Sequence, residues 1–492
     1  MLSKMGTPRL DTCIPLPIEQ EELETLVSKA KDWALMHGAG MRPMDAYDPD
    51  GMRFAPFVLL PSTFPKSEFD RAVQLQIVIN ELFHKVAHNH EFLVESLKST
   101  LEVDPFTAKL FSLYETIRRE GTAQKLSLGL IRSDLMLESG CPLLGKCSAY
   151  CCWKQVEVNT IASGFGWLGP ISSGIHRYVL SELGYQDKLK HLPENNALQG
   201  LCNGMLQAWE IYGQPKAVIL FVVEPVTYNI CDQRFHEFEV RRLNPLVTVI
   251  RRTLTQLAEQ AKLERDKRLI VENYEVAVVY YRSGYTPDDY PSEIEWDARL
   301  LIEKSLAIKC PTIQYHLAGT KKVQQALALP GALEKFLPDA RKAGHVQKIF
   351  TGLYSLDMDE FGDKAVKMAL SEPDRFVLKP QREGGGNNVY GKDIIDVLGK
   401  IQNSKERSAY ILMDRIVPPL QLNYMLRPGR GKAMYEPVDV VSELGIYGVV
   451  IGDEKTIIEN KQVGHMLRTK LASANEGGVA AGWGALDSPY LF

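Results

Sequence analysis

Phe376-Val-Leu-Lys-Pro-Gln-Arg-Glu-Gly-Gly-Gly-Asn-Asn-Val-Tyr390 is the stretch that decides the fold of this 492-residue chain. Its first three residues are aromatic or branched and apolar, which predicts a buried strand. The three glycines remove the Cβ barrier to unusual φ and ψ, so backbone N–H groups can converge on an anion. Lys379 and Glu383, both just ahead of the glycines, supply a positive charge and a carboxylate that suit a polyphosphate with its metal ion. From these residues alone, a phosphate-binding loop and a flexible hairpin tip with solvated charges are equally open.

The composition is that of an ordinary globular protein, with 45% apolar and 24% charged residues, and the length allows two or three domains. The net charge of −4, without a long run of like charges, argues against nucleic acid or an anionic membrane as a partner. Apolar runs such as Ala217–Val223 are too short to span a bilayer, and Met1–Leu16 lacks the apolar core of a signal peptide. We therefore expect a cytoplasmic protein that binds small molecules.

Four of the eight cysteines lie close together in the sequence, at Cys141, Cys147, Cys151 and Cys152. Their spacing is not the paired C-x-x-C of a zinc site, and no histidine lies among them. Eight cysteines are also too few for a disulfide scaffold in a chain of this length. We expect a loop of reduced thiols.

Apolar periodicity predicts helices over residues 18–37, 67–98 and 104–120 in the first part of the chain. Short strands are predicted at 57–60 and 126–131, with Arg132 at the end of the second.

The run Lys154–Asn159 alternates apolar and polar residues and predicts a further strand. Because side chains alternate across a strand, Glu157 and Asn159 share one face. Two oxygen ligands one pleat apart form half of a site for a hard cation such as Mg²⁺. The alternative is the solvated face of a half-buried strand.

Gly164-Phe-Gly-Trp-Leu-Gly169 follows as a formal G-x-G-x-x-G, before a helix predicted at 171–183. A dinucleotide-binding fold requires an apolar strand ahead of these glycines. The polar face with Glu157 and Asn159 does not suit a central parallel strand, so this interpretation is disfavoured.

Residues 215–310 alternate between strand and helix patterns, which predicts a small α/β subdomain with a mostly parallel sheet. Strands are predicted at 217–223, 247–251 and 276–282, and helices at 197–212, 232–243 and 253–262. Ligands of open α/β sheets bind at the carboxyl ends of the strands. Arg282–Tyr285 lies at such an end and is a candidate binding segment, with a plain surface turn as the alternative.

Lys321 and Lys322 begin a helix predicted at 322–329. A lysine there adds to the positive end of the helix dipole, which is unfavourable unless an anion binds. A solvated lysine pair is the alternative.

Later patterns predict a helix at 392–402 and strands at 410–413 and 444–451. Arg468 and Lys470 then precede Glu476-Gly-Gly-Val-Ala-Ala-Gly482, a loop small enough in its side chains to fold over a ligand.

The chain lacks several common catalytic motifs: G-x-S-x-G, H-E-x-x-H and the G-x-x-x-x-G-K-[ST] phosphate loop are all absent from the sequence. Its basic residues, oxygen ligands and glycine-rich loops instead fit nucleotide phosphates held together with Mg²⁺ outside such a loop.

Five motifs, in the same order, resemble eukaryotic-type glutathione synthetases over about residues 18–490: Leu317-Ala-Gly-Thr-Lys-Lys-Val-Gln-Gln325, Lys379–Asn388, Ser442-Glu-Leu-Gly-Ile446, Leu467–Lys470 and Gly477–Gly482. The resemblance implies an α/β ATP-grasp fold, a homodimer, and ATP- and Mg²⁺-dependent ligation of γ-glutamylcysteine to glycine through an acyl phosphate. Such chemistry needs positioning and charge neutralisation but no protein nucleophile.

The resemblance also implies a domain organisation. Residues 1–214 would form a main body with part of the metal and dipeptide site. Residues 215–318 would form the substrate-binding subdomain with its small parallel sheet. Residues 319–492 would form the ATP-grasp region, with a glycine-rich lid at about 340–440.

Site residues follow by position in the matching motifs. The metal ligands would be Glu157, Asn159 and Glu383, and Arg132 would stabilise the transferring phosphoryl group. The nucleotide would be held by Glu157, Lys321, Lys379, Gly384, Gly385, Gly386, Asn387, Asn388, Tyr390, Met413, Asp414, Ile416, Glu443, Lys470 and Glu476. The dipeptide and glycine would contact Arg132, Ala162, Ser163, Gly164, Asn229, Gln233, Arg282, Ser283, Gly284, Tyr285, Arg468, Val479 and Ala480.

The dipeptide pocket departs from the family pattern. Ala162 and Gly164 stand where the family has two serines, and Ser283 stands where an acidic residue often follows the pocket arginine. Each lost partner costs about 1–3 kcal/mol if the substrate group is buried. Three hypotheses follow: a working glutathione synthetase, a paralogue with a changed peptide donor or acceptor, and a catalytically weak nucleotide- or peptide-binding protein.

Overall fold

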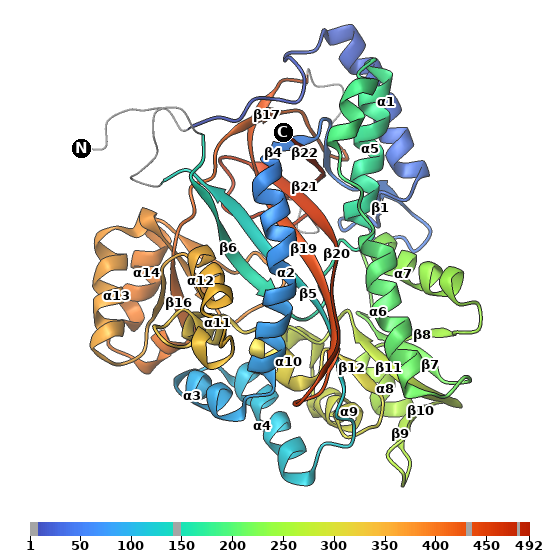
Figure 1. The fold of residues 1–492 in the computed structure, drawn as a ribbon, viewed down its shortest axis with the longest axis vertical. Coiled ribbons are helices and arrows are strands. Elements are labelled where there is room, and N and C mark those ends of the chain that lie inside the picture. Colours follow the sequence, from blue (N-terminus) through green and yellow to red (C-terminus); the bar gives the residue numbers. More distant parts are fainter. Residues whose placement is uncertain (1–7, 141–148, 430–434, 480–482) are drawn as a thin grey trace.

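The structure is a computed structural model that describes residues 8–140, 149–429, 435–479 and 483–492. Three sheets organise these residues (Figure 1). A long central sheet crosses the middle of the molecule. A second sheet, with α8 (Leu254–Gln260) and α9 (Glu293–Glu303), lies near its lower end, and a small third sheet, with α13 (Glu360–Ser371) and α14 (Lys392–Ile401), lies on one side of it.

The central sheet has eight strands among the described residues, in the order β18-β3-β21-β20-β19-β5-β6, with β17 beside β19. It is antiparallel except where β21 meets β3. Its strands are β3 (Phe57–Val58), β5 (Ser127–Glu138), β6 (Cys152–Asn159), β17 (Gln421–Asn423), β18 (Met425–Leu426), β19 (Val438–Gly452), β20 (Ile457–Leu471) and β21 (Gly484–Asp487).

Two predictions for this sheet are wrong. Strand β5 does not stop at residue 131, so Arg132 lies within it, paired with Asn159 on β6 and Tyr447 on β19. Strand β20, with Arg468 inside it, was not predicted at all. Polar residues fill its exposed half, and Gly464 interrupts its register at a bulge, so no regular alternation runs through it.

Helices cover both faces of the central sheet (Figure 1). α2 (Lys66–Ala87) packs on β19 and β20, and α6 (Ala197–Tyr212) also packs on them. The helices predicted over 18–37 and 171–183 are confirmed as α1 (Gln20–Met36) and α5 (Leu168–Glu182), which lie against each other.

The single helix predicted over 67–98 is wrong. The helix α2 ends at Ala87. The Asn89 side chain then caps α3 (His90–Leu101) by accepting a hydrogen bond from the Phe92 N–H. α4 (Pro105–Glu120) follows, capped by Asp104.

The second sheet confirms the mostly parallel pattern predicted after residue 215. Strands β8 (Val249–Arg252), β7 (Val218–Val222), β11 (Tyr274–Tyr281) and β12 (Ile308–Cys310) are parallel neighbours. An antiparallel extension, β10 (Leu269–Val271) and β9 (Ala261–Leu263), continues the sheet. Its helices are α7 (Ile230–Leu243), α8 (Leu254–Gln260) and α9 (Glu293–Glu303).

The third sheet contains the glycine-rich stretch Phe376–Tyr390. It is antiparallel in the order β13-β16-β14-β15. The predicted buried strand is confirmed as β14, whose Phe376 and Leu378 are fully buried against residues of α13 and α14. Its elements are β13 (Leu353–Ser355), α13 (Glu360–Ser371), β14 (Phe376–Pro380), β15 (Val389–Tyr390), α14 (Lys392–Ile401) and β16 (Tyr410–Asp414).

Short elements join these parts. Helices α10 (Ile313–Ala318), α11 (Lys321–Leu327) and α12 (Ala340–Ile349) lie between the second and third sheets in sequence. Two further sheets have two short strands each: β1 (Gly40–Met41) pairs with β2 (Arg53–Phe54), and β4 (Ser62–Phe64) pairs with β22 (Pro489–Leu491).

The described residues bear on two expectations: the absence of a membrane-spanning segment and the reduced state of the clustered cysteines. None of their helices combines the length and apolarity needed to cross a bilayer. Of the clustered cysteines, Cys141 and Cys147 lie outside the described residues. Cys151 is disulfide-bonded, so the expectation of reduced thiols is wrong at that position.

Asp487 on β21 is a buried carboxylate in the central sheet. It accepts hydrogen bonds from the Ser62 N–H at 3.2 Å, the Ser488 N–H at 2.7 Å and the Thr469 hydroxyl at 2.5 Å. Burial outweighs these donors and raises the pKa of Asp487 to about 7. Between its unfolded pKa and this value the native state holds a proton that the unfolded state has lost. Asp487 therefore costs stability as pH rises through that range.

We expect Asp487→Asn to gain stability relative to the parent chain as pH rises from 4 to 8, because the amide cannot ionise. The slope should approach about 1.4 kcal/mol per pH unit inside this window and vanish outside it. Urea denaturation of both proteins across the range measures the difference. A difference that does not change with pH would contradict the raised pKa.

Candidate functional site

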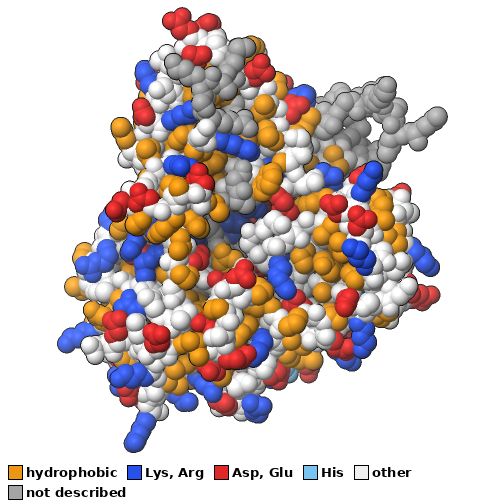
Figure 2. Space-filling model, turned by 180° about the vertical axis from the view of Figure 1, so that it is seen from behind, with side chains coloured by type: hydrophobic (Ala, Val, Ile, Leu, Met, Phe, Trp, Pro, Cys, Tyr) orange, Lys and Arg blue, Asp and Glu red, His pale blue; other side chains and the backbone are white. Residues whose placement is uncertain are grey.

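One large cavity, of about 850 Å³, lies where the three sheets meet. Strands β5, β6, β19 and β20 supply one wall, the third sheet supplies another, and the carboxyl ends of β7 and β11 close one end. Figure 2 views the molecule from behind and shows a hollow near the middle of this face, with Lys and Arg side chains in its depth.

Most predicted site residues line this cavity although they come from distant parts of the chain. These are Arg132, Glu157, Asn159, Ala162, Gly164, Asn229, Gln233, Arg282, Tyr285, Lys321, Lys379, Glu383, Gly384, Gly385, Asn387, Asn388, Tyr390, Met413, Asp414, Ile416, Glu443, Arg468, Lys470, Glu476 and Val479.

Four predicted residues are not among those that line it: Ser163, Ser283, Gly284 and Gly386. Ser163 donates to the carbonyl of Leu130 at 3.1 Å, and Ser283 donates to Asp289 at 2.6 Å, so both hydroxyls serve the local fold. Ala480 lies outside the described residues.

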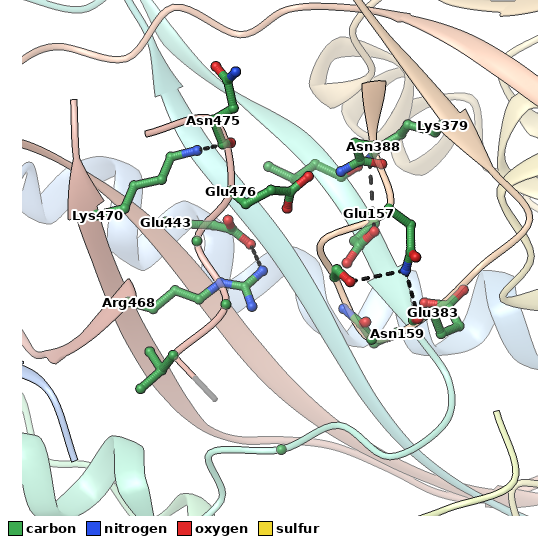
Figure 3. Close-up of a pocket in the computed structure, with 18 of the residues that line it drawn as sticks. Glu157, Asn159, Lys379, Glu383, Asn388, Glu443, Arg468, Lys470, Asn475 and Glu476 are labelled. Atoms are coloured by element: carbon green, nitrogen blue, oxygen red, sulfur yellow. Dashed lines mark hydrogen bonds and ion pairs between the residues drawn. The ribbon is translucent and has the colours of Figure 1, made fainter. Parts of the chain in front are cut away.

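A cluster of carboxylates and lysines occupies the centre of the cavity (Figure 3). Lys321 Nζ lies 2.9 Å from both oxygens of Glu383 and 3.1 Å from Glu157, and Lys379 Nζ lies 3.8 Å from Glu157. Glu157 comes from β6, Lys321 from the start of α11, and Lys379 from β14. The cluster therefore joins the central sheet to the third sheet. The solvated lysine pair considered above is wrong, because Lys321 and Lys322 are both buried.

The lysines favour the ionised form of Glu157, whereas burial raises the pKa of Glu383 above its ordinary value in spite of Lys321. Burial works against the charge of Glu157, but Lys321 and Lys379 outweigh it and hold the pKa of Glu157 well below its usual range. Burial likewise opposes the charge of Lys321, and the two glutamates raise its pKa above the ordinary value. The pKa of Lys379 is lowered, because burial and the nearby charge of Lys321 together outweigh the attraction of the surrounding carboxylates, of which Glu157 contributes most.

The oxygen groups of this cluster have the chemistry of an incomplete magnesium site. The described residues contain no group of three or more His, Cys, Asp or Glu side chains able to hold a metal. Two carboxylates and the Asn159 amide line the cavity together. Mg²⁺ characteristically takes one or two carboxylates and completes its shell with substrate phosphates and water. The donor set fits Mg²⁺ if the nucleotide supplies the remaining oxygens.

The triple-glycine loop requires glycine because of its backbone and not because of its surroundings. Gly384, Gly385 and Gly386 have φ of 93°, 71° and 77°. A Cβ added at Gly385 or Gly386 would meet nothing within 4 Å. Three successive residues in the left-handed region are unfavourable for any L side chain.

The end of the cavity at Met413 and Ile416 suits a flat apolar ring. Met413 and Ile416 pack with Met136 and Val441 in one buried cluster. Lys470 Nζ donates to the carbonyl of Asn475 at 2.5 Å. Apolar walls with polar groups at the edge are typical of adenine sites in nucleotide-binding clefts.

Glu476 connects the two glycine-rich loops, because its carboxylate accepts from the Gly386 N–H at 3.2 Å. Glu443 on β19 pairs with Arg468 on β20 at 2.6 Å (Figure 3). The carboxylates of Glu443 and Glu476 both line the cavity that holds Lys321 and Lys379.

The remaining end of the cavity is organised by Asp232. Its carboxylate accepts from the backbone N–H groups of Phe165, Trp167 and Leu168 at 2.8, 3.0 and 3.2 Å, and it pairs with Arg282 at 3.2 Å. It thus fixes both the loop that carries Gly164 and the arginine that faces it.

Gly164 has room for a small side chain beside this arginine. A Cβ added there would lie 3.5 Å from both Arg282 Nη2 and Asp232 Oδ2, which is ordinary van der Waals contact. Arg282 Nε is buried and has no hydrogen-bond partner in the described residues. A buried donor of this kind is available for a ligand carboxylate.

The glycines of the G-x-G-x-x-G segment have a packing role. A Cβ at Gly166 would meet His236 at 2.4 Å, and one at Gly169 would meet the His465 carbonyl at 2.8 Å. The strand before them, β6, is antiparallel to β5. The dinucleotide interpretation is therefore wrong.

Sequence reasoning missed several residues of the cavity wall, among them Phe165, Glu224 and Asn475. Glu224 follows β7 and accepts from Gln233 at 3.1 Å. The rule that ligands gather at the carboxyl ends of parallel strands could have found it. Phe165 and Asn475 are loop residues without a distinguishing local pattern.

Comparisons with known proteins agree with this geometry. Residues 20–491 match the family described as eukaryotic glutathione synthase, ATP-binding domain. Glutathione synthetase of Homo sapiens is 44% identical over 96% of this chain and 98% of its own length. The chloroplastic enzyme of Arabidopsis thaliana is 39% identical over 96% of this chain and 86% of its own.

Among solved structures, a glutathione synthetase-like effector from Globodera pallida in its apo form matches with a TM-score of 0.76 and 25% identity, covering 97% of this chain and 98% of that one. The family match and this neighbour confirm the α/β ATP-grasp fold. The chain belongs to the eukaryotic glutathione synthase family of ATP-dependent ligases.

Proposed function

We propose that this chain joins γ-glutamylcysteine to glycine with ATP and Mg²⁺, through an acyl phosphate on the cysteinyl carboxylate. The observation that carries the proposal is the pairing, within one cavity, of the buried Lys321 and Lys379 with the partly buried Glu157 and Glu383, which come from the central sheet, α11 and the third sheet with its loop. Buried lysines suit phosphates, and ionised carboxylates suit the cation that accompanies them.

The charge arrangement suggests what changes when Mg·ATP binds. In the structure Lys321 pairs with both Glu157 and Glu383. Triphosphate oxygens can take over the lysine, and the carboxylates together with Asn159 can then hold Mg²⁺. The bound ion would neutralise phosphate charge and polarise the transferred group.

The other residues have roles that need no protein nucleophile. The glycine loop and Lys379 would position the phosphates, and Met413, Ile416 and Tyr390 would enclose the adenine. Arg132 would stabilise negative charge on the transferring phosphoryl group and on the tetrahedral carbon that forms when the glycine amine attacks. Arg468 and the loop at Val479 would receive the glycine end, and Arg282 the opposite end of the dipeptide.

The proposal keeps three further expectations. The chain forms a homodimer, binds neither nucleic acid nor membrane, and works in the cytoplasm, where a thiol substrate stays reduced. Family membership supports the small-molecule substrates. Sedimentation at micromolar concentration and fractionation of cells that express the full chain test the oligomeric state and the compartment.

ADP release with γ-glutamylcysteine and glycine, coupled to a detection enzyme, tests the proposed reaction. Robust turnover excludes a paralogue with a changed substrate and a mere binding protein. Turnover only with another dipeptide or amine would overturn the proposal in favour of the paralogue. ATP binding without turnover across a broad substrate panel would favour a binding protein.

We expect Glu383→Gln to lower the rate of ligation by about 100-fold or more, a typical cost of removing one group that organises transition-state charge. The fold should survive, because Glu383 lies in a loop at the cavity and the uncharged amide has the same shape. Steady-state ADP release and circular dichroism measure the two effects. Glu372→Gln, an exposed surface residue outside the cavity that pairs with Arg375, is the matched control. Equal activity of both variants would refute the metal role.

Gly164→Ser should improve use of γ-glutamylcysteine. Its Cβ would fit in ordinary contact with Arg282 and Asp232, and its hydroxyl would then offer a partner to a polar group of the dipeptide bound beside Arg282. One added hydrogen bond to a charged partner should lower KM for the dipeptide about threefold to tenfold, while KM for ATP stays unchanged. Gly344→Ser, in open space on α12, is the control. A higher KM for the dipeptide in Gly164→Ser would show that the open space accommodates part of the substrate.

A further inference from the structure

Asp134 on β5 lies at the centre of the charged groups behind the cavity wall, although it does not line the cavity itself. Its side chain is completely buried. Arg132 Nε donates to Oδ1 at 2.6 Å, and Arg132 Nη2 donates to Oδ2 at 2.7 Å. This two-point contact fixes both the position and the plane of the guanidinium.

The same carboxylate contacts two more groups of the site. Asn159 Nδ2 donates to Oδ2 at 2.9 Å, and Arg468 Nη2 lies 3.6 Å from that oxygen. Because the amide nitrogen of Asn159 is directed to Asp134, its carbonyl oxygen is left for the cavity, where a cation would need it. One buried carboxylate thus sets the orientation of two arginines and one amide.

The backbone of the neighbouring strand leaves room for this arrangement. Gly445 on β19 lies opposite Asp134 in the sheet. A Cβ at Gly445 would lie 2.8 Å from Asp134 Oδ1 and 2.9 Å from the Cδ of Arg132. The φ of Gly445 is not in the left-handed region, so space and not conformation requires glycine here.

Charge balance explains why a carboxylate is needed at this place. Burial works against the charge of Arg132, and Asp134 more than offsets it and raises the pKa of the guanidinium. Arg132 and Arg468 share the same buried region, so each disfavours the charge of the other, and Asp134 lies between them. With a neutral residue at position 134, Arg132 and Arg468 would have one carboxylate fewer to balance their charges.

We propose that Asp134 is a positioning residue of the ligase site, which holds Arg132 toward the reacting carboxylate, Arg468 toward the acceptor and the Asn159 oxygen toward the cation. The proposal rests on the proposed function, because it assigns these directions from that reaction. Asp134 acts through the other residues and touches no substrate itself.

Asp134→Asn tests it, with Asp487→Asn as a matched control: a second fully buried aspartate of the same sheet that does not line the cavity. We expect the kcat of Asp134→Asn to fall about 100-fold, because the arginines lose their orientation. KM for γ-glutamylcysteine should change by less than about threefold, since positive charge at the site is not reduced. Asp487→Asn should keep its kcat within about threefold of the parent chain.

Calorimetry with Mn²⁺ and a non-hydrolysable ATP analogue supplies a second readout, which does not require turnover. We expect Asp134→Asn to weaken Mn²⁺ binding about 10- to 100-fold, the usual effect of losing a partner that orients a metal ligand. If the parent chain made no glutathione, the proposed function would fail while this measurement still decided the role of Asp134.

Two results would overturn the inference: unchanged kcat and Mn²⁺ affinity in Asp134→Asn, or equal losses in Asp134→Asn and Asp487→Asn that follow lost thermal stability. If Asp134→Asn does not fold, Gly445→Ala displaces the same pair without removing the charge. Gly129→Ala crowds the same sheet against Tyr315 and Val450, outside the cavity, and is its control. The kcat must then fall in Gly445→Ala and not in Gly129→Ala, and the opposite pattern would refute the proposal.

Discussion

The contact of Lys321 with Glu157 and Glu383 is the interaction on which the arrangement of the site depends. It joins a strand of the central sheet, the start of a short helix and the loop of the third sheet. A buried lysine charge is expensive on its own, and its pairing with two partly buried carboxylates offsets that cost. Because the same groups can pair with phosphates and a cation, this pairing holds them near the positions that a ligand requires.

The sequence predicted the local elements well where one pattern dominated. The parallel strands after residue 215 and the buried strand at Phe376 appear as expected. Patterns failed where tertiary pairing overrode them. β20 carries polar residues along its open half and a bulge at Gly464, and it is a strand because β19 pairs with it over its full length. The helix expected over 67–98 breaks because Asn89 caps a new helix at that point.

The site was predicted by two different routes. The triple-glycine loop and the Glu157–Asn159 face could be proposed from chemistry and spacing, but their convergence in one cavity could not, because the contacts span more than 200 positions. The family resemblance supplied most of the other predicted residues that line the cavity, but not Phe165, Glu224 or Asn475. Neither route found Asp134 or Asp232, because a buried aspartate that orients other side chains has no local sequence pattern.

The backbone of the loop at Gly384–Gly386 has a consequence that concerns chirality. All three residues lie in the left-handed region, and the space around Gly385 and Gly386 is empty. What excludes other residues is therefore the handedness of the L-amino acid itself and not a lack of room. A residue of the opposite configuration has the mirrored preference in φ, so this loop discriminates between the two hands of the same side chain.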